Sequence, residues 1–120
     1  MMHKNTLNLM IYVDCTKGND TNKVESKVMK QDVYESILAF IIYKTKDTQV
    51  REVSITYCGD EPFIHLYNII CFQRQVWDYC KQHHILLTAE ILGNANSLQK
   101  CDFEELIQLN IRRFVIDLLG

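Results

Sequence analysis

The stretch that decides the fold covers residues 50–62, with the sequence Val-Arg-Glu-Val-Ser-Ile-Thr-Tyr-Cys-Gly-Asp-Glu-Pro. Its centre alternates apolar and polar side chains with the period of two that is typical of a β-strand. Gly59 then permits a turn that other residues resist, and Pro62 suits the first turn of a helix, where its missing amide costs nothing. A strand followed at once by a helix predicts that the next strand lies parallel to it in the same sheet.

The rest of the chain repeats this alternation. Period-two patterns predict further strands over residues 6–13, 85–92 and 111–118. Helical spacing predicts helices over residues 32–44, residues 62–83 and a shorter segment from Asp102. In the second helix the expected inward stripe is Tyr67, Ile70, Cys71 and Trp77.

Between the first strand and the first helix, the polar segment 14–30 is interpreted as a long loop. The whole chain, residues 1–120, therefore has the order β-α-β-α-β-α-β. This order predicts a single α/β domain with a parallel sheet, equivalent to half of a (β/α)8 barrel.

Composition limits the classes of partner. The 120 residues are 48% apolar, as expected of a globular domain, and their net charge of -2 argues against nucleic acid as a partner. No apolar run approaches the roughly 20 residues needed to span a bilayer, so we expect no membrane association. The first residues lack a signal-peptide core, which predicts a cytoplasmic protein. No two of the five cysteines have Cys-x-x-Cys spacing, so reduced thiols are expected.

The predicted strand ends carry a set of short motifs. Leu7-Asn8-Leu9 precedes a cysteine-bearing loop, and Gly59-Asp60-Glu61-Pro62 follows the second strand. Leu87-Thr88-Ala89-Glu90 is placed at the carboxyl end of the third strand, and the last strand ends at Asp117 to Gly120. In this order the segments resemble the N-terminal half of a radical SAM enzyme, particularly the peptide- and sulfatase-maturing branch.

That resemblance implies a cofactor site. The family's Gly-Gly-Glu-Pro motif holds the amino group of S-adenosylmethionine, and its [4Fe-4S] cluster is bound by Cys-x-x-x-Cys-x-x-Cys. Cys15 stands at the first of these cysteine positions as a vestigial metal ligand, and asparagines stand at the other two. The candidate cofactor-binding residues carried over from the family are Gly59, Asp60, Glu61, Pro62, Thr88 and Asp117.

The departures from the family pattern concern chemistry. A neutral amide is a poor ligand for iron that prefers thiolate, so one cysteine and two asparagines are not expected to hold the cluster. Asp60 adds a Cβ and a negative charge where a backbone must approach the cofactor, and could repel its carboxylate. Ala89 and Glu90 replace an Asn-Gly pair, and Leu119 replaces an acid.

We therefore expect a degenerate radical SAM-like domain without catalytic residues or cofactors, acting as a binding or protein-interaction module. The alternative is a SAM-dependent radical enzyme, or a fragment of one, in peptide or protein maturation. In that case another chain would complete it, and it would bind S-adenosylmethionine and a [4Fe-4S] cluster.

A rebuilt metal site is also chemically conceivable, from Cys15, Cys58, Glu61 and His65. The commoner interpretation of the same residues is two packed thiols, a surface histidine and a helix-capping acid.

A half barrel would leave its first and fourth strands as edges with unpaired backbone groups. One face of its sheet would also lack the opposing wall of a complete barrel. No proline interrupts either edge strand. We therefore expect a homodimer, or a partner protein that covers these surfaces.

Overall fold

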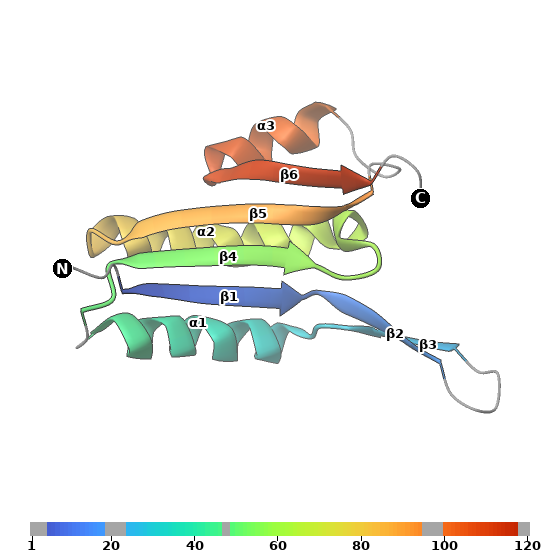
Figure 1. Ribbon diagram of the computed structural model, residues 1–120, viewed down its shortest axis with the longest axis horizontal. Helices are drawn as coiled ribbons and strands as arrows, with labels where there is room; N and C mark the ends of the chain where they lie inside the picture. Colours follow the sequence, from blue (N-terminus) through green and yellow to red (C-terminus); the bar gives the residue numbers. More distant parts are fainter. Residues whose placement is uncertain (1–4, 19–23, 47–48, 95–99, 118–120) are drawn as a thin grey trace.

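The computed structural model describes residues 5–18, 24–46, 49–94 and 100–117. Its centre is a four-stranded parallel sheet in the order β1-β4-β5-β6 (Figure 1). The strands are β1 (Thr6–Tyr12), β4 (Glu52–Cys58), β5 (Leu86–Asn94) and β6 (Ile111–Asp117). Successive strands are connected by the helices α1 (Gln31–Lys46), α2 (Leu66–Gln82) and α3 (Lys100–Gln108). The predicted order of parallel strands and helices is confirmed.

One face of the sheet is buried and the other is open. On β4, Val53, Ile55 and Tyr57 are completely buried and belong to a core that includes Ile69 and Phe72 of α2. Right-handed crossovers between neighbouring strands place the connecting helices on one face, and Figure 1 shows α2 behind the strands. On the other face, the described residues leave large side chains exposed: Met10, Tyr12, Leu86 and Val115.

A lateral row of side chains crosses this open face. The strand register aligns Met10, Thr56, Glu90 and Arg113. Thr56 Oγ1 donates to Glu90 Oε1 at 3.1 Å, and Arg113 Nε lies 3.1 Å from Glu90 Oε2. The open face is thus partly polar at its centre.

The predicted inward stripe of α2 is only partly right. Tyr67 is 79% exposed, whereas Ile70 and Trp77 pack at the margin of the core. The residues of α2 that are buried are Leu66, Ile69, Phe72, Gln73, Val76 and Cys80. A 3-10 helix, η1 (Pro62–His65), precedes α2. The predicted stripe is displaced by about one residue from the buried one, because the buried face includes the polar Gln73, which a search for apolar spacing does not select.

The segment predicted as a long loop contains an antiparallel hairpin. It is formed by β2 (Asp14–Gly18) and β3 (Val24–Val28), and it projects beyond the carboxyl ends of the parallel strands (Figure 1). The prediction of a loop was wrong because backbone pairing needs no buried face, and this polar segment has no apolar alternation to signal a strand.

The third parallel strand is longer than predicted. Gly93 and Asn94, which lie beyond the predicted end at residue 92, continue β5 and pair with β6. A Cβ at Gly93 would lie 2.8 Å from Pro62 Cγ and 3.1 Å from Phe63. Glycine here lets η1 pack directly on the strand, as glycines in strands often do where another segment approaches closely.

No helix in the described ranges is both long and apolar enough to cross a bilayer.

Candidate functional site

The carboxyl ends of β1 and β4 meet around one buried acid, Asp14. This residue is the first of β2, two positions after the last residue of β1, and it is 8% exposed. Its Oδ1 accepts a hydrogen bond from the Asp60 amide at 2.6 Å, and its Oδ2 accepts one from the Glu61 amide at 3.2 Å. The turn after β4 therefore presents two consecutive backbone N–H groups to one carboxylate, which is the arrangement of an anion-binding nest.

The local sequence explains this turn. Gly59 has a φ of +144°, a conformation that side chains disfavour. The Val13 amide donates to the Cys58 carbonyl at 2.9 Å, which extends the contact between the two chain segments up to Asp14. Asp14 is held at the concave side of the turn as a result.

Three further side chains surround this carboxylate. His65, the last residue of η1, places its Nε2 3.0 Å from Asp14 Oδ2. Burial, with a smaller contribution from the charge of Asp14, raises the pKa of the Tyr34 hydroxyl to about 12. The same two causes raise the pKa of the Cys58 thiol, whose Sγ donates to the Ile11 carbonyl at 3.6 Å. Both groups are therefore protonated near neutral pH, which suits neither a thiolate ligand nor a general base.

A hollow of about 550 Å³ opens beside the turn, on the uncovered face of the sheet. Its lining contains two acids and, among the described residues, no basic side chain. This combination of charges disfavours a ligand carboxylate. The lining residues are Met10, Tyr12, Asp14, Cys58, Gly59, Asp60, Leu92 and Gly93.

The predicted site residues are only partly brought together. Gly59, Asp60, Glu61 and Pro62 form the turn and the start of η1 as expected, with the Asp60 and Glu61 side chains exposed. Thr88 is exposed on the open face and pairs in register with Ser54. Because β5 continues to Asn94, Thr88 lies within the strand, and its predicted place at a strand end was wrong.

Two predicted residues are described only by their backbone. Cys15 lies in β2, and Asp117 is the last residue of β6, in register with Asn94. The structure does not describe the side chains of Cys15 and Asp117, so the roles predicted for these two residues stay predictions. Asn19 and Asn22 lie outside the described residues.

The rebuilt metal site is not assembled from the described side chains. Within residues 5–14, 28–46, 49–93 and the described part of 104–115, no three His, Cys, Asp or Glu side chains are placed to hold one metal ion. His65 pairs with Asp14 instead, and the Cys58 thiol is hydrogen bonded to a carbonyl.

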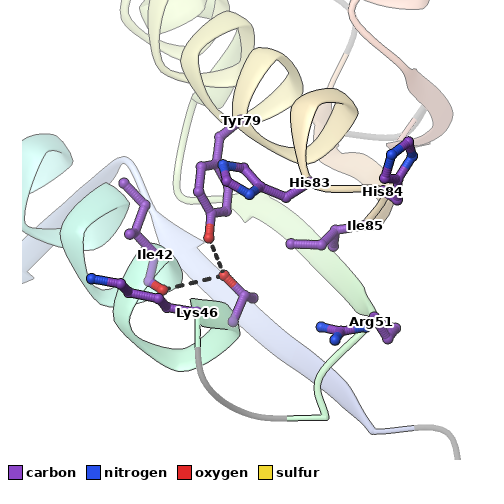
Figure 2. Close-up of a pocket in the computed structure, with 8 residues that line it drawn as sticks. Ile42, Lys46, Arg51, Tyr79, His83, His84 and Ile85 are labelled. Atoms are coloured by element: carbon purple, nitrogen blue, oxygen red, sulfur yellow. Dashed lines mark hydrogen bonds between the residues drawn. The ribbon is translucent and has the colours of Figure 1, made fainter.

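A second hollow, of about 500 Å³, lies at the opposite end of the sheet. Figure 2 shows Tyr79 reaching from α2 toward α1, where its hydroxyl is 2.7 Å from Thr45 Oγ1. The basic residues that line this second hollow are Lys46, Arg51, His83 and His84. Two helices end here, and their partial negative charge accounts for basic residues at this place without a ligand. We therefore assign no function to this hollow.

Comparison with models of protein families, with curated proteins and with solved structures finds no match to this chain.

Sequence reasoning missed the role of Asp14, which it placed only at the start of the polar segment 14–30. The available signal was an acid directly after an alternating strand, a position from which its side chain can reach the neighbouring turn. The partner turn is 46 residues away in the sequence, so no local pattern identifies the pair.

Proposed function

We propose that this chain is a degenerate radical SAM-like domain that works as a protein-interaction module and performs no radical chemistry. In this proposal the four parallel strands correspond to half of a (β/α)8 barrel. The open face of the sheet corresponds to the inner wall of that barrel.

The observation that carries the proposal is the position of Asp14. The resemblance assigns the turn at residues 59–62 to S-adenosylmethionine, but here the amides of Asp60 and Glu61 bind a carboxylate of the chain itself. Such charge-assisted hydrogen bonds, roughly 1.5–3 kcal/mol each, would have to be broken for a ligand to take their place. The acidic lining of the neighbouring hollow adds an electrostatic cost for a ligand carboxylate.

An interaction role is supported by the surface that the helices leave uncovered. Met10 and Tyr12 are each more than half exposed beside the hollow, although large apolar side chains are usually buried. A partner chain that covers them would remove apolar surface from water, and this favours association.

The test is anaerobic reconstitution of the chain with iron and sulfide, with Cys15→Ser as the matched control. We expect the same low iron content in both proteins and no reductive cleavage of S-adenosylmethionine. About four irons per wild-type chain, lost in Cys15→Ser and accompanied by cofactor cleavage, would overturn the proposal in favour of a radical enzyme.

A further inference from the structure

The four-stranded sheet ends at β1, and no described strand lies on its outer side. Among the described residues β1 pairs only with β4, on one side. The Asn5 carbonyl accepts from the Arg51 amide, and the Val13 amide donates to the Cys58 carbonyl. The backbone N–H and C=O groups of the odd-numbered residues of β1 therefore point toward β4. Since backbone groups alternate in direction along a strand, the even-numbered residues 6, 8, 10 and 12 direct their N–H and C=O groups outward. The strand contains no charge and no proline to block pairing there.

Helix α1 lies beside this edge, and no described helix or strand covers its outer side (Figure 1). An apolar groove of about 420 Å³ runs between the strand and the helix. The groove is lined by Leu9, Met10, Ile11, Tyr12, Met29, Ser36, Ile37 and Phe40.

Exposed apolar residues extend the groove along the helix. Val33 is 42% exposed, Phe40 42% and Tyr43 75%, and their spacing puts them on one side of α1. The aromatic side chains of Tyr12, Phe40 and Tyr43 together expose on the order of 350 Å². An exposed apolar area of this size is comparable with the largest patch on a typical monomeric protein, and such patches are often functional.

The surface is complementary to itself. A peptide added to β1 would cover the strand edge but leave the stripe on α1 in water, whereas a second copy supplies both a strand and a helix. When the two helices are antiparallel, the first turn of one, with Asp32, faces the last turn of the other, with Lys44. Lys44 Nζ lies 5.6 Å from the Phe40 ring, which places this charge beside the apolar stripe.

We propose that two copies of this chain associate about a twofold axis, with β1 pairing antiparallel to β1 and α1 packing against α1. An axis at Leu9 pairs Thr6 with Tyr12 and Asn8 with Met10, so all the outward backbone groups of β1 are used. On α1 the same axis brings Val33 opposite Tyr43. One twofold axis can serve both pairings, because Leu9 at the middle of β1 and Ile37 and Phe40 at the middle of α1 line the same groove. This inference rests on the proposed interaction role and names the partner.

Charge reversal tests this arrangement by sedimentation velocity at micromolar concentration. We expect a wild-type dimer and about tenfold weaker self-association of Asp32→Lys and of Lys44→Asp, because each variant places like charges opposite one another twice. Mixing the two variants should restore dimers at wild-type affinity, because every facing pair is then attractive. Glu104→Lys makes the same charge change on α3 and should leave the dimer unchanged.

Backbone pairing is tested separately by Asn8→Pro, which removes one outward N–H and should weaken the dimer at least tenfold, against Asn8→Ala as control. Circular dichroism verifies that each variant is folded. A monomeric wild type, or a dimer insensitive to both the charge reversals and Asn8→Pro, would overturn this inference. These outcomes are distinct from failure of the proposed function, which shows as iron binding and cofactor cleavage whatever the oligomeric state.

Discussion

The Asp14 carboxylate occupies the space that a Cβ on Gly59 would need. The two residues therefore depend on each other, since only glycine lets the acid enter the turn and only the acid satisfies the amides that the turn exposes. This contact joins the ends of β1 and β4 at the edge of the sheet where the candidate site lies. It ties the start of the hairpin to η1 as well.

Asp14→Ala should lower the free energy of unfolding by about 2–4 kcal/mol. The substitution leaves the amides of Asp60 and Glu61 without their acceptor and removes the partner of His65. Urea denaturation measures this loss. Asp60→Ala is the matched control, because its side chain is exposed, and it should cost less than about 0.5 kcal/mol. A loss below 1 kcal/mol in Asp14→Ala would show that the carboxylate is not the anchor of the turn.

Gly59→Ala should cost about 2–4 kcal/mol, because it combines an unfavourable positive φ with a collision at Asp14. Part of this cost depends on the Asp14 side chain. In a double-mutant cycle, the two substitutions together should therefore be less damaging than their sum by at least about 1 kcal/mol. Strict additivity would contradict the contact.

Tyr34→Phe should leave stability unchanged or raise it by about 1 kcal/mol. The Tyr34 hydroxyl is buried and has no hydrogen-bond partner among the described residues, so its removal relieves a desolvation cost. The ring contact with Phe72, at 5.4 Å between centroids, is retained.

The matched control for this substitution is Tyr57→Phe. The Tyr57 hydroxyl donates to Gln73 Oε1 at 2.5 Å, and both side chains are completely buried. Its loss leaves the Gln73 oxygen unsatisfied and should cost about 1–3 kcal/mol. Equal effects of the two substitutions in urea denaturation would contradict this account.

The parallel sheet could be predicted because its strands keep one open face. Strands of a sheet covered on both sides are apolar throughout, whereas here Leu87, Ala89 and Ile91 alternate with more exposed neighbours. The helices were recognisable because each also has one buried and one exposed side, which gives the apolar residues helical spacing. The hairpin gave no such signal because both of its strands are polar.

The candidate site was predictable only where its geometry is local. Gly59 and Pro62 indicate a turn and a helix start from their own backbone preferences. The partnership of Asp14 with this turn depends on which strands become neighbours, and that follows from the whole sheet. Gln73 is a similar case: it looks like a surface residue, but it is buried because it bonds to Tyr57 and to the Leu109 carbonyl.

Gly93→Ala should cost about 1–3 kcal/mol, because the new Cβ collides with the ring of Pro62. Pro62→Ala removes the Cγ that would be 2.8 Å away, so Gly93→Ala should be less costly in that background. Thermal unfolding of the four proteins measures the coupling. An equal cost of Gly93→Ala in both backgrounds would mean that the strand and η1 separate freely.

Alkaline pH should destabilise the fold through Cys80. Burial raises the pKa of this thiol from 9.0 to about 11, so the folded state holds its proton more tightly than the unfolded state does. The stability that depends on this proton is complete below pH 9 and is lost as the pH rises from 9 through 11. Between pH 8 and pH 11, the wild type should therefore lose about 2 kcal/mol more than Cys80→Ala. Val76→Ala, at a buried position of the same helix without a titratable group, should lose as much stability as the wild type over this pH range. Parallel losses in the wild type and Cys80→Ala would show that the buried thiol is not the group responsible.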